Sequence, residues 1–306
     1  MIKGTYIENQ REISMSKPRL MILGGSSSQL SLIKKARDMG FFTILADQNS
    51  QVEGRSYADS FFPASTFDID AVYHVAKDAK VQAITTIGTD QPILTATVVS
   101  NRLGLPTPLD NNQAMAVTNK AVMKPTLHQK GIPTLPFILL DKAFSSNEIK
   151  ALNTLSKPWV VKPVDSQGQR GINIVNNLTE LRAQIPQALK HSRDHRVIIE
   201  EYYDSKEMTV SGWVNSLGKL ELWTISDRVT FPLNMPKNHQ MSLGVCLAHR
   251  YPSSVADGNE SMVKEIMQEI CNAFNLINTP IYVQLLSGSK GIMVNEVACR
   301  LGGAYE

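Results

Sequence analysis

The chain has few cysteines, no strong excess of either charge and no long apolar run. Its three cysteines, Cys246, Cys271 and Cys299, lie far apart and form no C-x-x-C pair. This spacing excludes a cysteine-based metal cluster and argues against a disulfide framework, so we expect a cytoplasmic protein. The formal net charge of +3 comes without any block of lysine or arginine, and we expect no nucleic-acid partner. Since no apolar stretch is as long as a membrane-spanning helix, we expect no membrane association.

The length and composition predict a globular protein of more than one domain. The 306 residues are 42% hydrophobic and 19% charged, which is enough apolar material for a large core. Residues 1–17 are polar and carry acidic side chains, so we interpret them as a flexible tail rather than a signal peptide. We place a first domain at residues 18–108, ending at the proline-rich "LGLPTP", and a second at residues 109–306.

The first domain opens with a partial dinucleotide-binding pattern. The segment "LMILGGSSSQLSLIKKARDMGFFTILADQNS", residues 20–50, reads as strand, tight turn, helix and second strand. A complete fingerprint has three glycines, but Ser26 to Gln29 follow Gly25 here without a third. Two interpretations stay open: a nicotinamide dinucleotide site with Asp47 on the ribose, or a tight turn with Asp47 as a residue at the strand end. Strands and helices continue to alternate, which predicts an α/β domain with a Rossmann-like parallel sheet covered on both faces.

The second half has a different pattern and predicts an α+β domain. Short apolar runs separated by turns, such as "WVVKPV", "RVIIEEYY" and "KLELWTIS", indicate antiparallel strands. Helical spacing extends from residue 111 to Gly131. A long helix from Glu260 to Phe274 places Met262, Ile266, Ile270 and Phe274 on one face. We expect that face, together with Trp213 and Trp223, to lie in the core.

An ordered set of charged residues in this second half carries the chemical information. Lys120 begins a helix, and Lys162 lies on a strand before the loop "DSQGQRG". Two glycines in such a loop allow backbone amides to contact phosphate oxygens. Next, Glu200 and Glu207 lie seven residues apart, around a turn. Finally, a hairpin places Gln284 and Glu296 on facing strands, where their oxygen atoms could hold Mg²⁺; Arg300 follows in "NEVACRLGG".

This order of motifs resembles the ATP-grasp superfamily, and specifically its carboxylate–amine ligases. Biotin carboxylase, the large chain of carbamoyl phosphate synthetase and the aminoimidazole ribonucleotide carboxylating synthetase share the arrangement. The first domain resembles the one that precedes the grasp in those enzymes. The resemblance covers the chain from about Arg19 onward, and it implies a lid subdomain at about 125–200 and a C-terminal subdomain at about 201–306.

The resemblance implies that ATP and Mg²⁺ activate a small carboxylate as an acylphosphate, which an amine then attacks. It assigns the nucleotide contacts as follows: phosphates to Lys120 and Lys162, with Ser166, Gly168, Gln169 and Gly171 in the covering loop; adenine to Glu200, Glu201, Tyr202 and Tyr203; ribose to Glu207. It assigns the metal to Gln284 and Glu296, and gives Arg300, with Lys162, a catalytic role. Candidate contacts for the carboxylate and amine substrates are Gly25, Ser26, Gln29, Arg228 and Lys237.

Three departures from the superfamily pattern leave alternatives open. Gln284 stands where many members have glutamate, and Ala298 where many have asparagine. We expect that Asn295 does not replace the latter, because neighbouring strand residues face opposite sides. The chain ends soon after Arg300, and we expect relatives to continue further. The alternatives are a non-catalytic ATP-binding or regulatory protein and an NAD(P)-dependent oxidoreductase; a homodimer is one assembly that the sequence leaves open.

Overall fold

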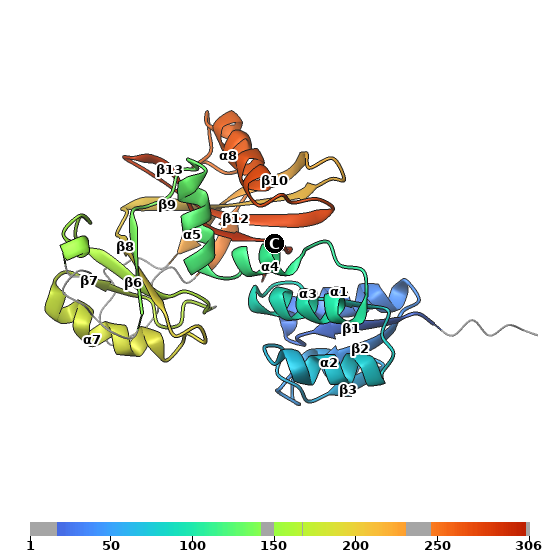
Figure 1. Ribbon diagram of the computed structural model, residues 1–306. Coiled ribbons are helices and arrows are strands. Elements are labelled where there is room, and N and C mark those ends of the chain that lie inside the picture. Colours follow the sequence, from blue (N-terminus) through green and yellow to red (C-terminus); the bar gives the residue numbers. More distant parts are fainter. Residues whose placement is uncertain (1–16, 142–149, 167, 231–245, 304–306) are drawn as a thin grey trace, which may run out of the picture.

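The computed structural model describes residues 17–141, 150–166, 168–230 and 246–303. Within these residues the strands form three sheets, one from the first half of the chain and two from the second (Figure 1). The predicted tail up to residue 16, Gln167 of the predicted phosphate loop and the candidate contact Lys237 lie outside the described residues. The predicted combination of a parallel sheet with antiparallel α+β units is confirmed.

The first sheet is parallel and has the strand order β3-β2-β1-β4. Its elements are β1 (Arg19–Leu23), α1 (Ser27–Asp38), β2 (Phe42–Ala46), the short 3₁₀ helix η1 (Glu53–Tyr57), β3 (Ser60–Phe62), α2 (Ile69–Asp78), β4 (Ala83–Thr85) and α3 (Gln91–Leu103). Leu20 and Ile22 of β1 pack towards α1, whereas Met21 and Leu23 pack towards α2 and α3. Both faces of the sheet are therefore covered, which explains why its strands are apolar without alternation.

The second sheet is antiparallel, has the order β5-β8-β6-β7 and is covered by helix α7 on one face. Its elements are β5 (Phe137–Leu140), β6 (Trp159–Pro163), β7 (Asn173–Val175), α7 (Leu178–Leu189) and β8 (Val197–Glu201). Trp159 and Val161 of β6 pack in the core beneath α7. Because side chains alternate along a strand, Val160 and Lys162 face the other side of the sheet.

The third sheet is also antiparallel and has the order β11-β10-β9-β12-β13. Its elements are β9 (Ser205–Val214), β10 (Leu220–Thr230), β11 (Cys246–Arg250), α8 (Glu260–Ala273), β12 (Thr279–Gly288) and β13 (Gly291–Ala298). Met208 and Val210 of β9 pack with helix α8 in the largest core cluster, and Figure 1 shows α8 lying across this sheet. Glu207 and Thr209 therefore lie on the opposite face.

Two short helices link the parallel sheet to the two antiparallel sheets. The helical spacing that we predicted from residue 111 to Gly131 is divided into α4 (Asn111–Ala116) and α5 (Lys120–Gln129). The side chain of Asn119 accepts a hydrogen bond from the backbone of Ala121 and so starts the second helix. This break sets the direction in which Lys120 and the residues after it project.

Two of the predicted core positions are wrong. Met262 of α8 is 49% exposed, because the buried face of the helix runs through Val263, Ile266 and Met267. Trp223 is 54% exposed, because the pairing of β9 and β10 shifts between Leu222 and Thr224 and leaves Trp223 as an extra residue. It stacks on Trp213, which was also predicted for the core but is only half-buried, with 6.5 Å between the ring centroids. Along the described part of the chain, none of the helices combines the length and the apolar character needed to cross a membrane.

Asp227 ties β10 to the segment that follows β11. Its carboxylate accepts four hydrogen bonds of 2.5 to 3.1 Å, from the hydroxyls of Ser253 and Ser254 and from the backbone of Ser254 and Val255. Burial acts to raise the pKa of Asp227, but the hydrogen bonds outweigh it and lower the pKa to about 2. The folded state thus holds this carboxylate ionised at a pH where the unfolded chain protonates it.

We therefore expect Asp227→Asn to destabilise the fold in a pH-dependent way. The folded pKa lies below the unfolded value of 3.8, so this stability is present above pH 4 and is lost as the pH falls towards 2. The charge contributes about 2 kcal/mol at pH 7. Urea unfolding at pH 7 and pH 3 should show the gap between wild type and variant narrowing at pH 3. Asp257→Asn, at an exposed site nearby, is the control, and an equal gap at both pH values would contradict the role of Asp227.

Candidate functional site

A cavity of about 1060 Å³ lies between the two antiparallel sheets, on the faces opposite α7 and α8. Val160, Lys162 and Glu200 line it from the second sheet, and Glu207 and Gln284 line it from the third. Further lining comes from Gly88 to Asp90, after β4 of the parallel sheet. Most of the residues that we predicted for the nucleotide and the metal are therefore brought to one cavity by three different parts of the chain.

Glu200 lies at the base of this cavity as a fully buried carboxylate between two lysines. Lys124 Nζ lies 2.8 Å from Glu200 Oε1, and Lys162 Nζ contacts Glu200 Oε2. Burial acts to raise the pKa of Glu200, but the two ammonium groups outweigh it and lower the pKa to about 2. Burial lowers the pKa of Lys124 to about 8, although Glu200 opposes the shift. Glu200 is therefore ionised at neutral pH.

Lys124 is a member of this cluster that we did not predict. Besides Glu200, its ammonium group donates to Thr134 Oγ1 and to the carbonyl of Val294, each at 3.0 Å. It thereby joins helix α5, strand β8 and strand β13 at one point. Its position four residues after Lys120 on the same helix was a signal available in the sequence, because residues i and i+4 share a helix face.

A second charge cluster lies on the β12–β13 hairpin. Gln284 and Glu296 are directly paired across the two strands, as predicted. Lys120 Nζ donates to Glu296 Oε1 at 2.6 Å. Burial acts to raise the pKa of Glu296, and the ammonium of Lys120 more than offsets this and lowers it. An ammonium group thus balances the carboxylate that we predicted as a metal ligand.

Asn295 also reaches the cavity, against our expectation from strand alternation. The register of the hairpin shifts between Gln284 and Leu285, so that Asn295 is an extra residue in β13. This bulge turns its side chain to the same face as Glu296. Asn295 accepts a hydrogen bond from Lys162 Nζ at 3.2 Å and donates to Gln284 Oε1 at 3.4 Å. The hairpin therefore presents three oxygen-bearing side chains, two of them amides.

Arg300 is held by an acid from the parallel-sheet half of the chain, which we did not predict. Its Nε and Nη2 both lie 2.6 Å from Asp90 Oδ1. The guanidinium also lies over the ring of Tyr282, 4.9 Å from its centroid. Burial raises the pKa of Asp90, and Arg300 opposes the shift. Asp90 follows β4 at the carboxyl end of its sheet, where loops commonly form binding sites.

Glu207 and Arg228, predicted for ribose and for a substrate acid, form an ion pair with each other. Arg228 Nη1 donates to Glu207 Oε2 at 2.5 Å. The two residues are directly opposite in the pairing of β9 and β10, and both line the cavity. One carboxylate oxygen of Glu207 is thus engaged by Arg228 within the site.

The predicted phosphate loop and the predicted adenine segment are mostly at the cavity wall. Ser166, Gly168 and Gln169 line it, whereas Gly171 packs against helix α7. Gly168, Gln169 and Gly171 have positive φ angles, so the chain turns sharply there. In the adenine segment, the side chain of Glu201 accepts from Lys290 at 2.6 Å.

The two tyrosines of that segment are held in place by hydrogen bonds to other parts of the protein. Tyr203 donates to the carbonyl of Gly291 at 2.7 Å, while the backbone nitrogen of Tyr202 donates to the carbonyl of Pro158 at 2.8 Å. Both residues line the cavity. The segment is therefore anchored to the hairpin tip on one side and to the start of β6 on the other.

The opening loop does not line the cavity. The backbone nitrogen of Gly25 donates to Asp47 Oδ2 at 2.9 Å, and that of Ser26 donates to Gln29 Oε1 at 3.1 Å. A Cβ on Gly25 would lie 2.7 Å from Val52, so little space remains on the outer side of the turn. Gln29 is buried and donates to the carbonyl of Ile87 at 2.6 Å. These contacts match the tight-turn interpretation, because the amides of Gly25 and Ser26 already have side-chain partners.

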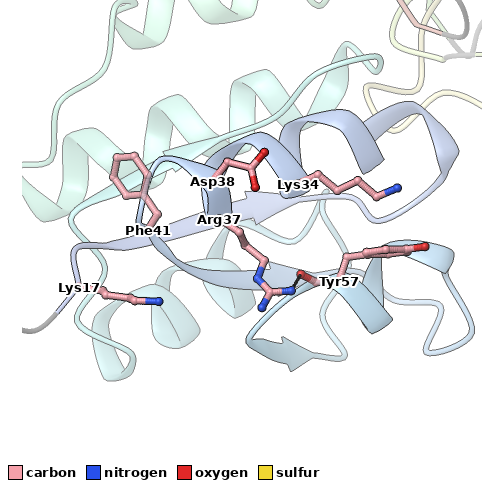
Figure 2. Close-up of a pocket in the computed structure, with 6 residues that line it drawn as sticks. All are labelled: Lys17, Lys34, Arg37, Asp38, Phe41 and Tyr57. Carbon is pink, nitrogen blue, oxygen red and sulfur yellow. Dashed lines mark hydrogen bonds between the residues drawn. The ribbon is translucent and has the colours of Figure 1, made fainter.

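A smaller cavity of about 270 Å³ lies at the end of the parallel sheet that is away from Asp90 (Figure 2). Two of its basic side chains, Arg37 and Lys34, contact neighbouring residues. Arg37 donates to the carbonyl of Tyr57 at 3.1 Å and lies 3.6 Å from Asp59, and Lys34 lies over the Tyr57 ring at 4.3 Å. This smaller cavity is remote from the cavity between the sheets, and none of the predicted site residues lines it.

Comparison with known proteins gives a family match to one segment and weaker similarity over most of the chain. Residues 126–229 match the family model described as D-ala D-ala ligase C-terminus. The D-alanine–D-alanine ligase of Staphylococcus epidermidis is 31% identical over 103 residues, which are 32% of this chain and 28% of the ligase. The chain thus spans less than a third of that relative's length. The N5-carboxyaminoimidazole ribonucleotide synthase of Staphylococcus saprophyticus is 22% identical over 91% of this chain and 69% of its own.

The fold is found among solved structures. The biotin carboxylase domain of the 2-oxoglutarate carboxylase from Hydrogenobacter thermophilus, solved with MgADP and bicarbonate, has a TM-score of 0.74. It is 14% identical, and the match covers 92% of this chain and 64% of that one. At this level of identity the likeness shows the fold alone.

The buried cluster around Glu200 leads to a prediction about stability. Lys124→Met keeps the length of the side chain but removes a charge that Glu200 needs. We expect a loss of about 3 kcal/mol in the free energy of unfolding, because breaking a buried ion pair leaves an uncompensated charge. Urea unfolding at pH 7 measures the loss. Lys264→Met on the exposed face of α8 is the matched control, expected within about 0.5 kcal/mol of wild type. Equal stability of the two variants would show that Lys124 does not support Glu200.

Proposed function

We propose that the chain is an ATP-grasp ligase that uses ATP and Mg²⁺ to activate a small carboxylate for coupling to an amine or a similar nucleophile; the matches described above support this proposal. The observation that carries the proposal is the placement of Lys162 and Glu200 on one wall of the cavity, opposite Gln284, Asn295 and Glu296 on the other. Such a site offers cations and oxygen ligands to a polyphosphate at the same time. We also propose the domain limits given above, at residues 18–108 and 109–306.

The adenosine part of ATP fits the second sheet and the edge of the third. Glu200 belongs to the cavity wall, and its carboxylate is already held by Lys124 at 2.8 Å and by Lys162. The backbone of the residues that follow Glu200 offers donors and acceptors to an adenine ring, and these residues also line the cavity. We assign the adenine to Glu200 and the backbone of residues 201–203. We assign the ribose hydroxyls to Glu207, whose second carboxylate oxygen they would use.

The phosphates and the metal fit the middle of the cavity. We assign the phosphates to Lys120 and Lys162, with Ser166 and Gly168 to Gly171 covering them. The hairpin fits Mg²⁺ because this ion accepts one or two carboxylates and completes its shell with phosphate oxygens and water. Glu296 supplies the carboxylate, and Gln284 and Asn295 supply amide oxygens. When bound, the ion would supply positive charge that neutralises the phosphates.

The reaction then needs positioning and charge rather than a nucleophile from the protein. An oxygen of the substrate carboxylate attacks the γ-phosphorus, the bond to the β–γ bridging oxygen breaks, and an acylphosphate and ADP form. The amine attacks the acyl carbon, phosphate leaves, and the amine loses a proton to give the amide. We assign the acyl group to the neighbourhood of Arg300, which Asp90 holds in a fixed orientation. The names of the relatives, a D-alanine–D-alanine ligase and a carboxyaminoimidazole ribonucleotide synthase, support a reaction of this class.

One observation favours a second candidate, an ATP-binding protein without catalysis. Glu296 is already balanced by Lys120 at 2.6 Å, and its partner across the hairpin is the neutral Gln284. A metal would have to compete with that lysine for a single carboxylate. The two candidates differ in whether bound ATP is consumed.

The proposal predicts thermal stabilisation by ATP with Mg²⁺. At a ligand concentration a hundredfold above Kd, binding adds about 2.7 kcal/mol to the folded state, which raises the midpoint by several degrees. We expect Lys162→Met to abolish the shift. We expect Glu296→Gln to abolish the part of the shift that depends on Mg²⁺, leaving any response to ATP alone. Differential scanning fluorimetry with ATP, ATP–Mg²⁺ and NAD⁺ measures the shift of the midpoint for the wild type and both variants.

Lys264→Met and Glu269→Gln on the exposed side of α8 are matched controls that should keep the full shift. Release of phosphate from ATP in the presence of carboxylate and amine mixtures then separates the ligase from the non-catalytic candidate. A shift with NAD⁺ and none with ATP would overturn the proposal.

A further inference from the structure

Cys246 lies at the wall of the large cavity, where it contacts a histidine. It is the first residue of β11, the strand at the edge of the third sheet. The side chain is half-buried and lines the same cavity as Glu207 and Glu296. Its sulfur lies 3.3 Å from Nε2 of His249. A thiol in contact with an imidazole, and open to a cavity, has the surroundings of a reactive cysteine.

Two buried hydroxyls hold the other side of the imidazole. Nδ1 of His249 lies 3.2 Å from Ser226 Oγ and 3.5 Å from Thr209 Oγ1. The two hydroxyls are 2.7 Å apart, and both residues are buried. These contacts fix the plane of the ring and leave Nε2 directed at the sulfur of Cys246. The imidazole is therefore held within reach of the thiol, whose sulfur also donates to the carbonyl of Ala248 at 3.5 Å.

A guanidinium group also lies near the sulfur. Thr230 is opposite Cys246, and Arg228 is opposite His249, in the pairing of β10 and β11. All four side chains therefore share the cavity face of the sheet. Burial acts to lower the pKa of Arg228, but Glu207, with smaller contributions that include Cys246, raises it. The positive charge of Arg228 is shared with Glu207, yet it stands on the side of the sheet where a thiolate would form.

The other two cysteines provide an internal contrast. Cys271 lies in α8, in the core against the third sheet, and burial raises the pKa of its thiol to about 12. Cys299, the residue that follows β13, is buried, and burial raises the pKa of its thiol even further. Neither has a histidine partner in the described residues. Among the three cysteines, Cys271 and Cys299 are thus enclosed and disfavoured as thiolates, whereas Cys246 lines a cavity and contacts a histidine.

We propose that Cys246 is a modification site, a thiol activated by His249 that reacts with small disulfides and electrophiles and thereby closes the cavity. In the step with a disulfide, the thiol proton passes to His249 and the thiolate attacks one sulfur of the reagent. A new S–S bond forms, the old one breaks, and the leaving thiolate takes a proton from the imidazolium. The balance needs no other oxidant, and a reducing thiol reverses it.

The effect on the cavity follows from where the sulfur lies. Cys246 lies beside Arg228 and therefore next to Glu207, to which we assign the ribose. Glutathione, a tripeptide, attached to the sulfur of Cys246 would fill part of the space in which we place the nucleotide. This consequence depends on the proposed function, whereas the reactivity of the thiol does not.

Alkylation by iodoacetamide at pH 7, followed by mass spectrometry of each cysteine peptide, tests the reactivity. We expect Cys246 to react about tenfold faster than an ordinary accessible thiol, represented by free glutathione in the same tube. Cys271 and Cys299 should remain unlabelled in the folded protein. His249→Asn should bring the rate at Cys246 down to that of glutathione. A rate at Cys246 no higher than that of glutathione, or no effect of His249→Asn in a variant with an unchanged melting midpoint, would overturn the proposal.

Glutathione disulfide tests the closure. We expect treated wild type to lose its stabilisation by ATP–Mg²⁺ and to regain it with dithiothreitol, while Cys246→Ser keeps its own untreated response. If Cys246 carries glutathione and the shift by ATP–Mg²⁺ is unchanged, closure of the cavity is wrong. If untreated protein shows no shift with ATP–Mg²⁺, the proposed function fails, while the alkylation rates still decide whether Cys246 is an activated thiol.

Discussion

The buried charge of Glu200 is the constraint on which the cavity depends. A carboxylate that is 2% exposed needs partners, because an isolated ion in the interior is strongly unfavourable. The partners come from different elements, Lys124 from α5 and Lys162 from β6. Since Lys124 also reaches the carbonyl of Val294 on β13, this cluster links the two antiparallel sheets. The walls of the cavity are thereby held at a separation that leaves room for a ligand.

Much of the arrangement could be read from the sequence because it depends on local spacing. The apolar run around Lys162 predicted that this residue lies on a strand, and the hairpin predicted that Gln284 opposes Glu296. The parallel sheet followed from apolar strands that alternate with helices. These features need no knowledge of distant parts of the chain, which is why a pattern within a few residues sufficed.

The features that the sequence did not reveal depend on irregular pairing or on distant contacts. Asn295 reaches the cavity through a bulge, and a bulge changes which residues share a face without leaving a mark in the alternation. Asp90 meets Arg300 across 210 positions of sequence, a pairing that no local pattern encodes. Trp223 has an aromatic side chain typical of a core strand, but it lies at a register shift and stacks on Trp213 at the surface.

Three cations that line the cavity are already paired with carboxylates, and this bears on the kind of anion that would bind beside them. Lys120 is paired with Glu296, Lys162 with Glu200 and Arg228 with Glu207. Binding of an anion here is therefore an exchange of partners, and its free energy is the difference between two sets of ion pairs. An anion that binds without a metal ion would pair with a lysine and leave the former carboxylate partner of that lysine without a counter-ion. A ligand that arrived with its own divalent cation would satisfy both groups at once, so these three ion pairs would favour metal complexes over bare anions.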